Sequence, residues 1–127
     1  MMRAQLRYLD SPDVPCGDLA SYSPPSPDDF LILVGAAIGP SAESGEEIFY
    51  FIVCTPTFLE RKLLKEKYLF PRNYLLLDLY DYAVLRGAIN DLCERSEGPD
   101  WETIAKRLAR YAQWEFEEDE KESLART

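Results

Sequence analysis

The residues best suited to chemistry in this chain stand near its C-terminus, where aromatic rings and carboxylates share one short run. From Tyr111 to Glu120 the sequence reads Tyr-Ala-Gln-Trp-Glu-Phe-Glu-Glu-Asp-Glu. An aromatic anchor inside an acidic rim is typical of an interface hot spot for a cationic partner. The run contains no imidazole and no thiol, the groups from which general bases, nucleophiles and metal sites are most often built. It therefore indicates binding rather than catalysis.

The two large rings of this run, Trp114 and Phe116, also have a purely structural interpretation. In it, both rings complete the core at the end of the last helix, and the acids from Glu117 to Glu122 form a solvated tail. So many like charges oppose the continuation of a helix unless a base neutralises them. Buried rings and displayed acids are compatible, so neither interpretation excludes the other.

Two further groups of acids are candidates for contact with a partner. Glu46 and Glu47 follow a turn that contains glycine, and they belong either to an ordinary polar hairpin or to a protruding one that docks into a basic cleft. Asp78 stands inside the apolar pattern from Leu76 to Tyr80, which would bury it in part and raise its pKa. Pairing at a strand end close to Asp81 explains its position equally well.

Catalysis is disfavoured by what the rest of the sequence lacks. The chain has no histidine, which excludes Ser-His-Asp and Cys-His arrangements. It has no phosphate-binding glycine loop, dinucleotide-binding motif or EF-hand loop. Its three cysteines are odd in number and widely spaced, so they predict neither a disulfide framework nor a zinc site. We expect no cofactor, no metal and no enzymatic activity; a hydrolase that uses only carboxylates is the third hypothesis.

The charge balance restricts the class of partner. The chain has 127 residues with 23 acidic and 14 basic side chains, a formal net charge of −9. This surplus disfavours nucleic acid and an anionic membrane surface as partners. A basic protein is the natural partner, since the acidic field would accelerate their encounter. Alternatively, the acids only keep the protein soluble.

The sequence also indicates a location. No segment resembles a signal peptide, and the longest apolar run, Phe30 to Ile38, is too short to span a bilayer. Cys54 and Cys93 lie in apolar patterns and are expected to be small core residues. These features predict a protein of the reducing cytoplasm.

The strands that must position these residues can be placed from periodicity. Alternation predicts a strand over residues 2–8, and apolar runs predict strands over 30–38, 46–54 and 74–80. The second and third of these are joined by a short turn and are expected to form an antiparallel hairpin. The segment 10–27 is rich in Pro, Ser and Asp, which predicts a long surface loop.

Three helices are expected. The first runs to about Lys67 from Thr55, whose hydroxyl is expected to cap the helix before the proline at its first position. The second runs from about Asp81 to Arg95, and Asp100 caps the third. The inward-facing residues are expected to be Leu59 and Leu63 in the first helix, Tyr82, Leu85, Ile89 and Leu92 in the second, and Trp101, Ile104, Leu108 and Tyr111 in the third.

The order β-β-β-α-β-α-α places strands before helices. It predicts an α+β fold in which a mainly antiparallel four-stranded sheet carries the helices on one face. We expect a single domain over residues 1–127, with a short acidic tail from about residue 117. The sequence does not predict an oligomeric state.

Several short segments, taken in order, give the chain a family resemblance. They are Leu9-Asp10-Ser11-Pro12-Asp13, Pro27 to Phe30, Ile38-Gly39-Pro40, Gly45-Glu46-Glu47, Phe49 and Phe51, Val53-Cys54-Thr55-Pro56, Trp101, Tyr111 and Trp114-Glu115-Phe116. With these segments the chain resembles immunity protein 8, a family of cytoplasmic antitoxins from bacterial polymorphic toxin systems. The resemblance implies an α+β protein that protects its producer by binding a toxin domain. It implies no particular toxin and no particular binding residues.

The combined prediction is an immunity protein that binds and neutralises a cognate toxin; the alternative is an acidic interaction adaptor without a toxin partner. A nuclease toxin is the most economical target, because its phosphate-binding cleft would be basic. Tyr80 and Trp114 are the candidate aromatic anchors. The candidate acidic contacts are Glu46, Glu47, Asp78, Asp81, Glu115, Glu117 and Glu118.

Overall fold

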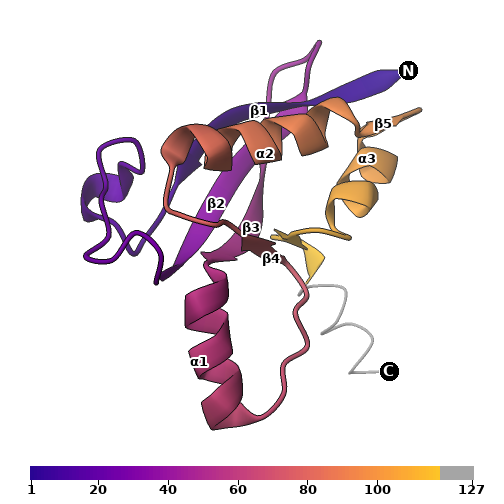
Figure 1. Cartoon of the computed structure of the whole chain (residues 1–127). Coiled ribbons are helices and arrows are strands. Elements are labelled where there is room, and N and C mark those ends of the chain that lie inside the picture. Colours follow the sequence, from indigo (N-terminus) through magenta and orange to yellow (C-terminus); the bar gives the residue numbers. More distant parts are fainter. Residues whose placement is uncertain (118–127) are drawn as a thin grey trace.

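The computed structural model describes residues 1–117, which form one curled mixed sheet and three α-helices (Figure 1). The sheet order is β4-β3-β2-β1-β5, and β6 pairs with β3 beside this path. The strands are β1 (Met2–Asp10), β2 (Leu31–Pro40), β3 (Glu47–Cys54), β4 (Tyr74–Leu76), β5 (Glu97–Gly98) and β6 (Gln113–Trp114). The helices are α1 (Pro56–Glu66), α2 (Tyr82–Glu94) and α3 (Trp101–Leu108), with a short 3-10 turn at Pro15–Gly17.

The three long strands form the antiparallel centre of the sheet, as the sequence predicts. β2 pairs with β1 on one side and with β3 on the other. The register of β1 shifts between Leu6 and Tyr8, and the Arg7 guanidinium donates to the carbonyls of Pro40 (2.6 Å) and Glu43 (2.7 Å). Arg7 thereby ties β1 to the turn of the β2–β3 hairpin, which protrudes from the sheet in Figure 1.

The hairpin turn requires glycine at position 39, next to the last residue of β2. A Cβ atom on Gly39 would lie 2.0 Å from the carbonyl oxygen of Gly45, so no other residue fits without moving the backbone. Gly45 itself has a φ of 99°, a conformation that L side chains rarely adopt. The chain after this turn, which carries Glu46 and Glu47, is therefore placed by tight backbone contacts.

One face of the sheet carries the core, under α2 and α3. Phe49, Phe51 and Val53 alternate along β3 and are all buried. They join Leu85 and Ile89 of α2 and the buried residues of α3 in a single hydrophobic cluster. In Figure 1, α2 crosses in front of the sheet and α3 lies beside it. The opposite face of β3 carries Ile48, Tyr50 and Ile52, which are only half-buried.

The prediction of a mainly antiparallel four-stranded sheet is wrong in its details. The predicted strand 74–80 shortens to β4, Tyr74–Leu76, which runs parallel to β3. A helix joins β3 to β4, and a helical crossover is the usual connection between parallel strands. Two further two-residue strands extend the sheet: β5 pairs with Met2 and Arg3, and β6 pairs with Phe49 and Tyr50. Segments this short have no periodicity by which to be recognised.

The prediction that all helices pack on one face is wrong for α1. None of its residues is buried, and Leu63 and Leu64 are exposed. Figure 1 shows α1 extending away from the sheet. Its start was placed correctly at Thr55 and Pro56, but the Thr55 hydroxyl does not cap the helix. That hydroxyl is buried and instead accepts the backbone N–H of Phe30 at 3.2 Å, which anchors the helix start to the chain entering β2.

The other two helices match their predicted starts. In α2, Leu85, Ile89 and Leu92 are buried, as the stripe predicts. In α3, Ile104 and Leu108 are buried, but Tyr111 is 53% exposed and does not belong to the inward stripe. The helix ends at Leu108, so the helical period no longer governs where Tyr111 lies.

The predicted surface loop between β1 and β2 also contributes to the core. Val14 and Leu19 are buried in the hydrophobic cluster, and Tyr22 packs against Tyr80 with ring centroids 5.3 Å apart. A loop of this length packs stably because it brings its own apolar side chains. Cys54 and Cys93 are buried, as predicted, and Cys16 is exposed.

Candidate functional site

Some of the aromatic and acidic residues singled out by the sequence meet around one carboxylate, that of Glu47, at the start of β3. Oε1 of Glu47 accepts hydrogen bonds from the indole nitrogens of Trp101 and Trp114, the latter at 3.3 Å. Trp101 opens α3 and Trp114 ends β6, so Glu47 joins three elements. Phe49 lies beside both indoles, stacked with Trp114 and edge-on to Trp101. We call Glu47, Phe49, Trp101 and Trp114 the indole cluster.

The acids that follow the indole cluster are also engaged within the protein. Oε1 of Glu115 accepts the backbone N–H of Ile48 at 3.2 Å, and Oε2 of Glu117 accepts that of Trp114 at 3.3 Å. Glu117 also pairs with Arg72, in the segment that returns from α1. The Glu115 bond fastens the residue after β6 to β3, and the Glu117–Arg72 pair ties the same stretch to the segment after α1. The two described acids of the predicted rim, Glu115 and Glu117, are therefore engaged within the protein, whereas residues 118–120 lie outside the described part of the chain. The ring of Phe116 packs edge-on against Trp114 and is 43% exposed.

The remaining predicted contacts lie elsewhere, beside the start of α2. The Tyr80 hydroxyl donates to the carbonyl of Leu19 at 2.6 Å, and its ring packs edge-on against Tyr22 and Phe30. Burial raises the pKa of Tyr80 to about 12, so the phenol stays protonated and keeps this bond. Asp81 caps α2 by accepting the backbone N–H groups of Ala83 (3.0 Å) and Val84 (3.3 Å).

The predicted residues therefore form two groups rather than one site. The indole cluster lies at the first residues of β3, whereas Tyr80 packs on Phe30, which pairs with Thr55 beyond the last residue of β3. Two predicted acids, Glu46 and Asp78, are exposed, so their charges face solvent. The expected partial burial of Asp78 is wrong, because β4 ends at Leu76 and the apolar pattern around Asp78 does not form a strand. Glu118 lies outside the described residues, as does the rest of the predicted acidic tail after Glu117.

Several surface residues with the chemistry of a contact were not singled out by the sequence reasoning. On α1 and the segment after it, Leu64, Tyr68 and Phe70 are 69–83% exposed. On β3, Ile48, Tyr50 and Ile52 make the face opposite the core apolar. The one available signal was the continuous apolar character of residues 48–54, because a strand with one wetted face would alternate.

The described chain offers no assembled centre for metal chemistry. Within residues 1–117, no group of three or more His, Cys, Asp or Glu side chains gathers in a way that could hold a metal ion. The same residues contain no helix that is both long enough and apolar enough to cross a membrane. What the arrangement presents is an ordered surface of rings, acids and apolar side chains.

Comparison with known proteins assigns the chain to a family. The sequence model of immunity protein 8 matches residues 4–119, which include every strand and helix described above except the first two residues of β1. No curated protein and no solved structure matches the chain. Since the match covers nearly the whole chain, this protein belongs to the immunity protein 8 family.

Proposed function

We propose that this protein is an antitoxin that binds a cognate toxin domain and neutralises it by stoichiometric association. The observation that carries the proposal is the family match over residues 4–119. An immunity function needs a stable surface and no turnover, so we propose that the protein is not an enzyme. We place its action in the cytoplasm, where its free thiols would stay reduced.

We further propose that electrostatic attraction brings the toxin to the protein. The chain carries a net charge of −9, and such a field accelerates encounter with a basic partner. A nuclease toxin fits this proposal, because a cleft that binds phosphate must be basic. Toxins of other classes with a basic surface would be attracted by the same field.

The contacts we propose divide by their role in the fold. Glu46 and Asp78 are exposed and make no hydrogen bond or ion pair among the described residues, so their charges are free to meet a partner. Glu115 is exposed but holds Ile48, and Glu47, Trp114 and Glu117 support β6. We propose that Glu46 and Asp78 contact the toxin through their charge. We propose that the residues bonded within the protein act by keeping the surface in its folded conformation.

Co-expression tests the proposal. The toxin domain encoded by the neighbouring gene is expressed in bacteria with this protein or with an empty vector, and survival is counted. We expect rescue, together with a 1:1 complex in size-exclusion chromatography with light scattering. A catalytic mode of protection would rescue at far less than one equivalent of the protein. Failure to rescue or to bind would refute the proposed function.

A further inference from the structure

Three arginines of this acidic protein line one surface depression, and none of them has a carboxylate partner among residues 1–117. Arg95, at the end of α2, and Arg107 and Arg110, in and after α3, line a hollow of about 250 Å³ together with Tyr111. Among residues 1–117, no carboxylate lies within 4.0 Å of any of these three guanidinium groups, although Arg3, Arg61 and Arg72 each have one. In a chain with 23 acids, this lack of partners within the protein is notable.

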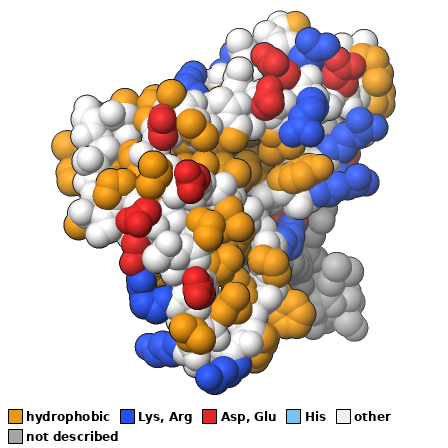
Figure 2. All heavy atoms as spheres, viewed as in Figure 1, with side chains coloured by type: hydrophobic (Ala, Val, Ile, Leu, Met, Phe, Trp, Pro, Cys, Tyr) orange, Lys and Arg blue, Asp and Glu red, His pale blue; other side chains and the backbone are white. Residues whose placement is uncertain are grey.

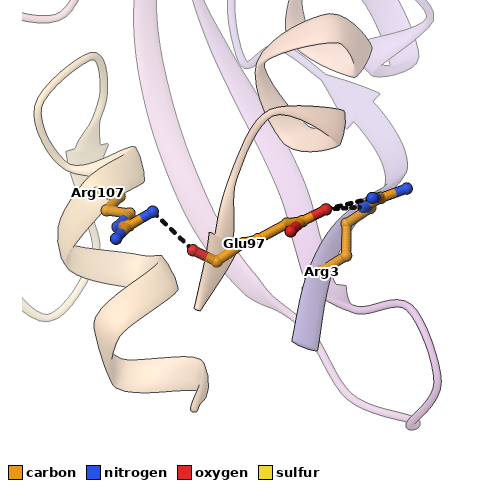
Figure 3. Close-up of polar contacts among 3 residues, drawn as sticks. All are labelled: Arg3, Glu97 and Arg107. Carbon is orange, nitrogen blue, oxygen red and sulfur yellow. Dashed lines mark hydrogen bonds and ion pairs between the residues drawn. The ribbon is translucent and has the colours of Figure 1, made fainter. Parts of the chain in front are cut away.

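The position of Glu97 shows how Arg107 keeps its charge available. Glu97 lies between two arginines, and Figure 3 shows its carboxylate turned toward Arg3 and its backbone carbonyl toward Arg107. The Arg107 Nη1 atom donates to that carbonyl at 2.8 Å, while the carboxylate accepts from the Arg3 Nε atom at 3.0 Å. The Arg107 side chain is thus held in place by a neutral acceptor, and no carboxylate of residues 1–117 pairs with its charge.

A second hollow of about 270 Å³ adjoins the first and is apolar. Its lining includes Phe51, Leu75 and Ile89, and it shares Leu92, Arg95 and Tyr111 with the hollow lined by the three arginines. Its acidic side chain is Asp91. In Figure 2, hydrophobic side chains gather across the middle of this face, with Lys and Arg side chains toward α3. We call the two hollows together the arginine-rimmed cleft.

We propose that the arginine-rimmed cleft receives an acidic segment of the toxin, with one apolar side chain in the apolar hollow and neighbouring carboxylates on Arg95, Arg107 and Arg110. This inference rests on the proposed function, because the segment belongs to the toxin. The toxin would then be basic enough overall to be attracted over long distances, and would carry a local acidic contact.

The chemistry of the cleft favours a protein segment over other ligands. One hollow is mainly apolar and the other is cationic, so a ligand that fills both must carry an apolar group beside anionic groups. A peptide supplies both kinds of group on neighbouring residues. Arginine forks bind carboxylates in a bidentate way, and the 53% exposed ring of Tyr111, which borders both hollows, offers a contact of the kind enriched at hot spots.

Two variants test the cleft by toxin binding in surface plasmon resonance. Arg95→Gln with Arg110→Gln removes two of the charges, and Ala88→Trp fills the apolar hollow, which Ala88 lines. We expect each to weaken affinity by roughly 10- to 100-fold, mainly through faster dissociation. The matched controls are the double variant Arg86→Gln with Lys65→Gln and the single variant Ala83→Trp, which lies on α2 like Ala88. None of these three positions borders the cleft, so both control variants should bind normally. Variants are compared only where their unfolding midpoints equal that of the wild type.

A peptide titration tests the cleft without the toxin, so the two proposals can fail separately. The acidic peptide Asp-Glu-Phe-Glu-Asp is added to the isotope-labelled protein, and amide shifts are followed by NMR. We expect shifts at Ala88, Leu92 and Tyr111 that vanish in both cleft variants and are absent with Lys-Lys-Phe-Lys-Lys. Wild-type protein that fails to bind the toxin refutes the proposed function. The proposed role of the cleft is refuted if the cleft variants bind the toxin normally or if the acidic peptide causes no shifts. It is also refuted if inorganic phosphate or Asp-Glu-Gly-Glu-Asp causes equal shifts.

Discussion

The Glu47 carboxylate accepts a hydrogen bond from the indole nitrogen of Trp101, although the two residues stand 54 positions apart in the chain. The same oxygen accepts from Trp114 at 3.3 Å. Both tryptophans of the protein are therefore oriented by one acid at the start of β3. A residue that the sequence suggests as a surface contact is thus also a structural acceptor, and its substitution must be interpreted through stability before binding.

Replacing Glu47 should destabilise the fold through the loss of an acceptor. We expect Glu47→Ala to lower the free energy of unfolding by about 1–3 kcal/mol, because two half-buried indole N–H groups lose their partner. Glu47→Gln keeps an oxygen acceptor and should lose less. Urea denaturation followed by tryptophan fluorescence measures both. Equal losses from the two variants would show that the negative charge, rather than the acceptor, is what matters.

Leu108 tests the assigned core. Its side chain is 1% exposed in the hydrophobic cluster, so Leu108→Ala should leave a cavity and cost about 2–5 kcal/mol. Leu64→Ala is the matched control on α1, where the side chain is 69% exposed; its effect should stay within about 0.5 kcal/mol. Denaturant midpoints of the two variants and the wild type give the comparison. Similar midpoints for Leu108→Ala and the wild type would contradict the packing of α3.

The sequence predicts well those elements in which local pattern and burial agree. β1 to β3, α2 and the start of α3 have clear periods or caps, and the structure has them within a few residues of their predicted bounds. The periodicity of a helix does not predict which other element the helix packs against. Leu59 and Leu63 have the spacing of a buried stripe, but α1 buries none of its residues, because the helix extends away from the sheet (Figure 1). Strands of two residues, such as β5, depend on long-range pairing alone.

The site was harder to predict than the fold for a related reason. Residue type suggested Glu47 and Trp114 as contacts, but their roles depend on which elements meet at the start of β3. The sequence does not predict the arginine-rimmed cleft, since Arg95 follows α2 and Arg107 belongs to α3, and only the fold shows that neither pairs with a carboxylate of residues 1–117. The net charge indicates an acidic protein and does not show that the arginine-rimmed cleft is cationic.

The three cysteines should differ sharply in reactivity. Burial raises the pKa of Cys93 to about 12 and also raises that of Cys54, whereas Cys16 is exposed. Because the thiolate is the reactive form, we expect iodoacetamide near neutral pH to modify Cys16 alone in the native protein. All three should react after unfolding in guanidinium chloride. Intact-mass spectrometry counts the modifications, and native labelling at Cys54 or Cys93 would contradict their burial.

Acidification should weaken the tie between β1 and β5. A hydrogen bond from Arg3, together with its positive charge, holds the pKa of Glu97 below its ordinary value of 4.5. A lowered pKa in the folded state stabilises the protein above the unfolded pKa, and this stabilisation is lost as the pH falls through the folded value. Thermal melts between about pH 6 and pH 3 should therefore fall less steeply for Glu97→Gln than for the wild type. Solvent reaches both side chains, which are 54% and 38% exposed, so high salt should reduce the difference. Identical slopes at low salt would contradict the ion pair.

Charge reversal at the two free acids tests how the toxin is attracted. Glu46 and Asp78 are exposed and have no polar partner among the described residues, so Glu46→Lys with Asp78→Lys should leave the fold intact. We expect slower association with the toxin, a weaker salt dependence of the association rate, and a smaller change in dissociation, because long-range fields act on encounter. Surface plasmon resonance at two salt concentrations measures all three. Glu60→Lys with Glu94→Lys makes the same change in net charge at other exposed positions. If the control variant slows association as much, the net charge attracts the toxin and the two acids are not contacts. If neither variant nor salt alters the association rate, electrostatic attraction is not how this protein finds its partner.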